Sequence, residues 1–133
     1  MKKIRGYVYS RPFMGARVPQ HVQNLVIRDY CKKHELHFLL STVEYSILGS
    51  LLILEQLLEE LETIDGIVMY SLFQLPENIK QRHRIYDYTL NSKSTMHFAL
   101  EGLSMENEKQ KTRIENIWLV RHTLPHCLSF KEN

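Results

Sequence analysis

The chain has 133 residues, the length of a single domain, and its 44% hydrophobic and 24% charged residues are typical of a globular protein. This composition excludes a disordered or fibrous protein. The net charge of +2 is too small to indicate nucleic-acid binding, and we interpret the basic clusters at 82–84 and 109–113 as solvated helix faces. Gly49 and several Glu and Gln residues interrupt the most apolar region, 47–61, so we expect no membrane span.

The two cysteines, Cys31 and Cys127, lie far apart in the sequence and form no Cys-x-x-Cys motif. The first residues, Met-Lys-Lys, lead directly into a strand pattern and not into an apolar signal core. We therefore expect reduced thiols and a cytoplasmic protein.

Strand and helix patterns alternate along the chain. Residues 4–10 and 36–42 are short runs rich in β-branched and aromatic residues, and the helix between them has apolar residues at helical spacing. The predicted strands are residues 4–10, 36–42, 67–72 and 96–100. The predicted helices are residues 18–34, a leucine-rich segment from Ser46 or Ser50 to Glu62, residues 77–91 and residues 104–119. The tail, 121–133, contains Pro125 and is expected to be partly ordered at best.

This alternation predicts an α/β fold, a single domain from residue 1 to 133 with a parallel sheet between two helix layers. The commonest compact arrangement of four such strands has the order 2-1-3-4, as in flavodoxin-like proteins. The order reverses between strands one and three, which opens a crevice at their carboxyl ends. Residues 10–17 then face residues 70–74 across this crevice, and we expect any functional site there.

Arg11 and Arg17 are the central candidates for that site. Both follow the first strand, and arginine binds phosphate or carboxylate through paired N–H groups, with further donors from the helix that starts near Pro19. They indicate an anion site, although arginines also pair with surface carboxylates. His21, in the first turn of that helix, is a candidate general acid or base or a solvent-facing side chain.

Further candidates lie near the same edge. Ser10 and Glu101, with His21, are predicted to transfer protons, although Glu101 and Glu44 are alternatively exposed or helix-capping carboxylates. Aromatic and amide groups near a phosphate site suit the ring and hydroxyls of a sugar or nucleoside. The alternative for Tyr9 and Tyr70 is a packing role, because tyrosines in strands commonly pack in the core. The predicted substrate-binding residues are Arg11, Arg17, Gln20, Asn24, Tyr9, Tyr70, Ser71, Gln74 and Glu44.

The seven histidines do not match a metal site. His34 and His37 are separated by a strand boundary, and Pro125 interrupts the pair His122 and His126. The sequence has no phosphate-binding glycine motif and no Gly-x-Ser-x-Gly elbow. We therefore predict neither a metal nor a cofactor.

The order of elements resembles the catalytic domain of serine recombinases, the resolvase and invertase family, over about residues 3–119. That family begins with Gly-Tyr-x-Arg-x-Ser and ends its third strand with Leu-Asp-Arg-Leu. Residues 6–11 here read Gly-Tyr-Val-Tyr-Ser-Arg, and residues 72–75 read Leu-Phe-Gln-Leu. The resemblance implies the resolvase-like fold and the location of the site. Tyr9 stands at the position of the family's catalytic arginine, and Arg11 stands at the position of its serine nucleophile. The resemblance therefore does not imply DNA strand exchange.

Residues 9–24 and 66–76 are similar to a family of small bacterial proteins that occur sporadically in gene clusters for surface carbohydrates, such as O-antigen or capsule. This resemblance covers nearly the whole chain and implies a pathway, not a mechanism. Together with the predicted anion site at Arg11 and Arg17, this pathway leads to our first hypothesis, an enzyme that modifies a sugar nucleotide or sugar phosphate.

Two alternatives remain open. One is a non-catalytic assembly protein that forms a homodimer, or binds a pathway enzyme, through the last helix and Trp118. The other is a DNA-binding relative of the recombinases.

Overall fold

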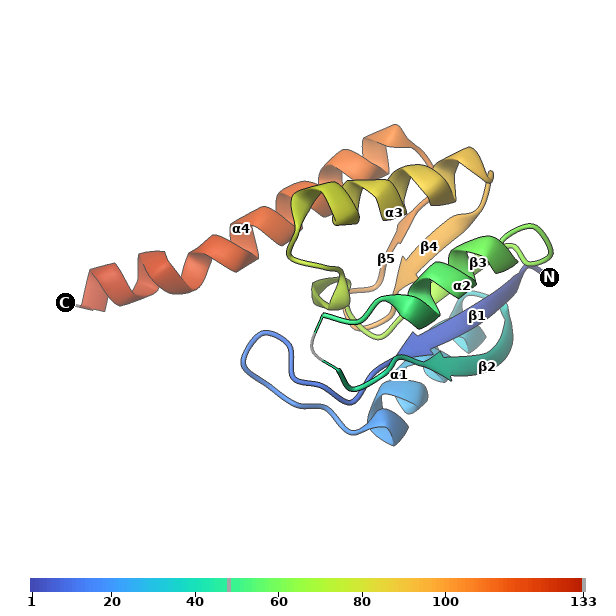
Figure 1. Cartoon of the computed structure of the whole chain (residues 1–133), viewed down its shortest axis with the longest axis horizontal. Helices are drawn as coiled ribbons and strands as arrows, with labels where there is room; N and C mark the ends of the chain where they lie inside the picture. The colour runs from blue at the N-terminus through green and yellow to red at the C-terminus, as the bar shows by residue number, and fades with distance from the viewer. Residues whose placement is uncertain (48, 133) are drawn as a thin grey trace.

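The computed structural model describes the backbone of residues 1–47 and 49–132 and the side chains of residues 1–47 and 49–123. The strands form one sheet in the order β2-β1-β3-β4-β5 (Figure 1). They are β1 (Lys3–Val8), β2 (His37–Val43), β3 (Gly66–Met69), β4 (Thr95–Phe98) and β5 (Leu103–Met105). The helices are α1 (Gln20–Lys33), α2 (Leu52–Glu60), the 3-10 turn η1 (Leu72–Gln74), α3 (Ile79–Asn91) and α4 (Glu108–Glu132).

The predicted α/β class and the order 2-1-3-4 of the first four strands are confirmed, and β1 to β4 are parallel. The fifth strand, β5, was not predicted. It pairs antiparallel with β4 through a short turn at Gly102, where we expected a loop and the start of the last helix. A strand of three residues is too short to show the alternation of apolar and polar residues by which strands are recognised. Its strand conformation depends on pairing with β4, which the sequence pattern does not reveal.

Some predicted helix ends were wrong. Neither Ser46 nor Ser50 is the cap of α2, which begins at Leu52 after Leu51. α4 begins at Glu108, later than the predicted Ser104, and continues to Glu132, past the predicted end at Leu119 and through the predicted tail. Figure 1 shows α4 projecting beyond the rest of the domain.

The two faces of the sheet bury separate apolar clusters. On one face, β1 contributes Tyr7 to a core with α2, α3 and α4. On the other face, Ile4, Val8 and Val68 pack against α1 through Ile27. Successive strand residues point to opposite faces, so this division follows from the strand period of two. The result is the predicted three-layer domain, with α1 alone on one face.

His97 is buried between the sheet and α1. Its ring nitrogens lie 2.8 Å from Tyr30 Oη and 2.8 Å from Thr95 Oγ1. Burial, assisted by the nearby His34 and Lys2, lowers the pKa of His97 to about 4. The imidazole is therefore neutral in the folded protein at neutral pH.

This burial predicts acid sensitivity. A histidine of the unfolded chain titrates near pH 6.5, so between about pH 6.5 and pH 4 the unfolded state binds a proton that the folded state does not. The free energy of unfolding should fall by about 2 to 3 kcal/mol across that interval because of His97 alone. Urea unfolding at pH 7 and pH 4.5 should show a smaller loss in His97→Gln than in the unsubstituted protein. The exposed His37→Gln is the control, and equal losses in all three proteins would contradict the assignment.

Cys31 is buried against Ile4 and Tyr30 in the core, and burial raises the pKa of its thiol to about 11. Cys127 lies outside the residues whose side chains the structure describes. Within the described part of the chain, no helix combines the length and apolarity that crossing a membrane requires.

Candidate functional site

A small hairpin follows β1. Phe13 and Ala16 pair through two backbone hydrogen bonds of 2.9 and 3.0 Å, and both residues between them have positive φ, 50° at Met14 and 76° at Gly15. Two positive φ values in a two-residue turn define the tight hairpin that glycine at the second position favours. The hairpin holds Phe13 and Met14 over the carboxyl end of the sheet.

Two buried amides join this hairpin segment to η1. Gln74 Nε2 donates to Gln23 Oε1 at 2.9 Å, and Gln23 Nε2 donates to the carbonyls of Tyr9 and Val18 at 2.7 and 2.8 Å. The side-chain oxygen of Gln74, Oε1, accepts from Ser71 N at 3.2 Å. Gln74, predicted to bind substrate, is 2% exposed and its amide is engaged in this network, so its first role is structural.

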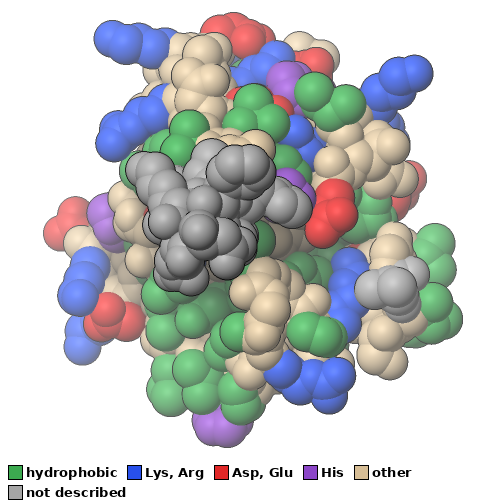
Figure 2. Space-filling view, turned by 90° about the vertical axis from the view of Figure 1, so that its left-hand side faces the viewer, with side chains coloured by type: hydrophobic (Ala, Val, Ile, Leu, Met, Phe, Trp, Pro, Cys, Tyr) green, Lys and Arg blue, Asp and Glu red, His purple; other side chains and the backbone are tan. Residues whose placement is uncertain are grey.

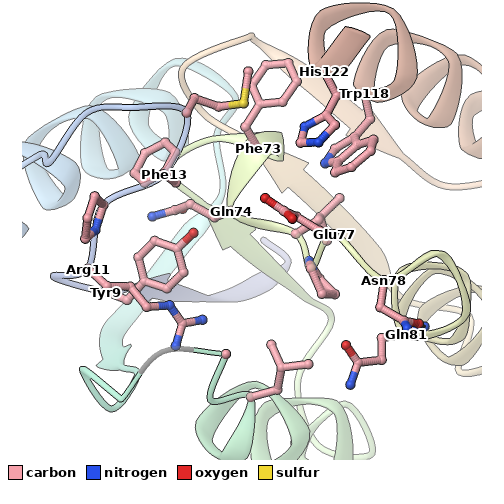
Figure 3. Close-up of a pocket in the computed structure, with 16 residues that line it drawn as sticks. Tyr9, Arg11, Phe13, Phe73, Gln74, Glu77, Asn78, Gln81, Trp118 and His122 are labelled. Atoms are coloured by element: carbon pink, nitrogen blue, oxygen red, sulfur yellow. The ribbon is translucent and has the colours of Figure 1, made fainter.

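A pocket of about 510 Å³ lies where the hairpin, η1, the start of α3 and α4 meet (Figure 3). We call it the Arg11 pocket. Its lining residues are Tyr9, Arg11, Pro12, Phe13, Met14, Gly49, Leu51, Phe73, Gln74, Leu75, Pro76, Glu77, Asn78, Gln81, Trp118 and His122. The pocket is at the edge of the sheet and between the two turns that the sequence predicted to face each other.

Arg11 is the one arginine that lines this pocket among the described side chains. Its guanidinium lies 4.4 Å from the centre of the Tyr9 ring, and Nη1 donates to the carbonyl of Ile47 at 3.0 Å. Among the described residues no carboxylate lies within ion-pair distance of it. Arg11 therefore keeps N–H donors and an unneutralised charge for an anion. Burial raises the pKa of Tyr9 to about 12, against the opposing effect of Arg11, so Tyr9 is a neutral hydroxyl.

The predicted site residues divide between two adjoining hollows. Tyr9, Arg11 and Gln74 line the Arg11 pocket, whereas Tyr70, Ser71 and Glu101 line a neighbouring hollow of about 340 Å³. The two hollows share Phe13, Met14 and Phe73.

Ser71 and Glu101 are bound to each other. Ser71 Oγ donates to Glu101 Oε2 at 2.7 Å, and Leu72 N donates to Glu101 Oε1 at 2.9 Å. Glu101 thus caps the N-terminus of η1, one of the alternatives that the sequence left open. Neither side chain lines the Arg11 pocket.

Arg17 does not join Arg11. Arg17 and His21 are exposed, Ser10 and Gln20 are partly exposed, and none of the four lines either hollow. The expected pair of arginines is therefore not assembled, because Arg17 lies after the Met14-Gly15 turn with its side chain exposed and outside both hollows. Asn24 is also engaged elsewhere, since its Oδ1 accepts from Ser41 Oγ at 2.5 Å.

Glu44, another predicted binding residue, is 2% exposed and caps α2. Its carboxylate accepts from the backbone N–H groups of Ile53 and Leu54 at 3.1 and 3.2 Å, and from Tyr7 Oη at 2.9 Å. Ser50 Oγ and Tyr45 N donate to it as well. Ser50 thus reaches the helix start through Glu44 and does not cap it directly.

Most of the wall formed by α3 and α4 was not predicted from the sequence. Glu77, Asn78 and Gln81 come from the start of α3, and Trp118 and His122 from α4. The first group lies at the start of the helix that was predicted over residues 77–91. Nothing marked His122, because its position depends on where α4 crosses the sheet edge.

A buried ion pair holds this wall in place. Arg82 donates from Nε and Nη2 to the two oxygens of Glu115, both at 2.7 Å, and from Nη1 to the carbonyls of Pro76 and Glu77 at 3.1 and 2.9 Å. Arg82 also lies 3.7 Å from the centre of the Trp118 ring. Its charge thus serves to join α3, α4 and the turn before α3.

Figure 2 looks at the end of the domain from which α4 projects. Hydrophobic side chains occupy much of the surface around the grey atoms, and the Lys and Arg side chains are scattered over this face without a continuous patch. Among the described side chains, no three His, Cys, Asp or Glu residues gather as metal ligands.

These features define a three-layer α/β domain with a mixed polar and aromatic pocket at the carboxyl edge of its sheet. Its fold is resolvase-like. It is similar to a resolvase family site-specific recombinase from Streptococcus pneumoniae, with a TM-score of 0.63 and 9% identity over 98% of this chain and 99% of that one. It is also similar to the N-terminal catalytic domain of TP901-1 integrase, with a TM-score of 0.63 and 12% identity over 92% and 98% of the two chains. No protein-family model matches the chain, and no curated protein matches its sequence.

Proposed function

We propose that this protein binds a sugar nucleotide or sugar phosphate in the Arg11 pocket and acts in the synthesis of bacterial surface carbohydrate, such as O-antigen or capsule. The observation that carries the proposal is the un-neutralised guanidinium of Arg11 at one wall of a pocket of about 510 Å³ with aromatic and amide walls. The pathway rests on the sequence resemblance of residues 9–24 and 66–76.

The pocket offers each part of such a ligand a matching group. Phosphate oxygens accept hydrogen bonds from a guanidinium, and sugar hydroxyls pair with carboxylates and amides, here those of Glu77, Asn78 and Gln81. Aromatic rings such as Phe73 supply a surface for an uncharged ring. An inorganic anion would bind to Arg11 without contacting these amide, carboxylate and aromatic side chains, so the lining favours a larger ligand.

The residues that we propose for proton transfer differ from those that the sequence predicted. His21, Ser10 and Glu101 do not line the pocket, whereas His122 and Glu77 do. An imidazole and a carboxylate are the usual general acids and bases of sugar chemistry. We therefore assign these two residues to that role.

Arg11→Ala should weaken the binding of uridine diphosphate glucose or a related nucleotide sugar roughly 10- to 100-fold, the cost of a lost charge-assisted hydrogen bond. Isothermal titration calorimetry measures this affinity. Arg17→Ala is the matched control, because it removes the same charge from an exposed side chain outside the pocket, and its affinity should stay within about threefold. Equal losses in both variants, or no binding by any nucleotide sugar or sugar phosphate, would refute the proposal.

A second candidate is the assembly protein. α4 projects from the domain, and Leu119 and Val120 on it are 41% and 61% exposed. Such an apolar stretch suits a homodimer or a partner enzyme. Light scattering after size exclusion distinguishes the two functions, since a dimer disrupted by Val120→Glu, with no response to nucleotide sugars, would favour assembly. Strand exchange is not proposed, because a scissile phosphate requires several arginines, and Arg11 is the single arginine among the described residues that line the pocket.

A further inference from the structure

The orientation of Trp118 in the Arg11 pocket is fixed from both sides of its ring. Arg82 lies 3.7 Å from the ring centre, and the His122 ring is stacked on Trp118 at 4.4 Å with an interplanar angle of 15°. The side chain is 4% exposed. Trp118 therefore cannot turn without disturbing the ion pair between α3 and α4.

The indole N–H of this fixed side chain has no partner. Trp118 Nε1 is buried, and no acceptor lies within hydrogen-bond distance of it among the described residues. Figure 3 shows this edge of the indole turned toward the inside of the pocket. Buried donors are rarely left unpaired in native proteins, because the loss of hydration costs about 1 to 3 kcal/mol. A ligand in the pocket that presents a hydrogen-bond acceptor to Trp118 Nε1 would satisfy this donor.

The surroundings of Trp118 favour an uncharged acceptor. Arg82, the cation that lies against the Trp118 ring, already binds both oxygens of Glu115. The Glu77 side chain projects into the pocket between the Arg11 wall and the Trp118 wall, and its charge disfavours a second anion there (Figure 3). A hydroxyl or carbonyl oxygen on a neutral ring meets these conditions, and the aromatic rings of His122 and Phe73 accommodate that ring.

We infer that Trp118 donates its indole N–H to a neutral oxygen of the sugar, so that the ligand spans the pocket with its phosphate at Arg11 and its uncharged ring at Trp118 and His122. This inference rests on the proposed function and adds the direction in which the ligand lies. It also makes Trp118 a specificity residue, because a site with a buried donor discriminates against ligands that lack the acceptor.

The chain contains one tryptophan, so a ¹⁵N-labelled sample gives a single indole signal. Uridine diphosphate glucose should move this proton signal downfield as the N–H gains an acceptor, with guanosine diphosphate mannose as a second probe. Inorganic phosphate, which satisfies only the Arg11 end, should leave it in place. Binding that depends on Arg11 in calorimetry without movement of the indole signal would overturn the inference and leave the proposed function standing. Absence of any binding would overturn both.

Trp118→Phe gives an independent test, because it keeps an aromatic ring and removes the N–H. Affinity for the nucleotide sugar should fall roughly three- to tenfold while affinity for phosphate is unchanged. Tyr86→Phe is the matched control, since it disturbs Glu115 in the same cluster but does not line the pocket. Equal affinities in both variants would contradict the inference. The indole signal of the unsubstituted protein decides the matter if Trp118→Phe fails to fold.

Discussion

Replacing Arg82 by methionine is expected to lower the free energy of unfolding by about 3 to 5 kcal/mol, the usual cost of removing one partner of a buried ion pair. Arg82 is 1% exposed, and its removal strands the carboxylate of Glu115 inside the protein. Burial alone would raise the pKa of Glu115, but the hydrogen bonds from Arg82 and Tyr86 hold it below its usual value. Without Arg82 the carboxylate loses that stabilisation, and the contacts between α3, α4 and the turn at Pro76 are lost with it.

Urea unfolding of the variant, followed by circular dichroism, measures this loss. Arg84→Met is the matched control on the same helix, because Arg84 pairs with Glu55 at the exposed surface. Such a pair contributes about 0 to 1 kcal/mol. If the two variants lost the same stability, Arg82 would not be the residue that holds α3 to α4.

Glu44→Ala is the second large effect that we expect, a loss of about 3 to 5 kcal/mol in the free energy of unfolding, because several buried donors lose their acceptor at once. These donors include the Tyr7 hydroxyl and the first N–H groups of α2. The carboxylate also stabilises the positive end of the helix dipole. The result would assign Glu44 to folding and not to substrate binding.

The controls separate charge from hydrogen bonding. Glu44→Gln keeps one acceptor oxygen and should lose about half as much, whereas Glu59→Ala, on the exposed side of α2, should change stability by less than about 0.5 kcal/mol. Chemical denaturation measures all three. A Glu44→Ala variant with normal stability and no nucleotide-sugar binding would restore Glu44 as a ligand residue.

Periodicity and chain order predicted the architecture well. The alternation of strands and helices predicted the α/β class, and the commonest compact arrangement of four such strands gave the order 2-1-3-4 that the first four strands have. β5 and the length of α4 were missed for opposite reasons. Leu103–Met105 is too short to show a period, and Pro125 suggested an end that the helix does not have at that position.

The site was predicted only in part, because residue type does not reveal what surrounds a side chain. Arg11 was placed correctly by its position after the first strand, but Arg17 beyond the Met14-Gly15 turn is directed elsewhere. Glu44 and Glu101 have the chemistry of ligands as well as of helix caps, and the sequence left both roles open because residue type does not show which backbone N–H groups lie beside a carboxylate. His122 lies more than a hundred residues from Arg11, so their shared pocket depends on the tertiary packing of α4.

A crystal structure of the protein soaked with uridine diphosphate glucose tests the central claim most directly. We expect electron density in the Arg11 pocket, with phosphate oxygens at the guanidinium of Arg11 and a sugar oxygen at Trp118 Nε1. Density for the phosphates at Arg17 or elsewhere on the surface, with the pocket left open and Arg11 unengaged, would contradict it.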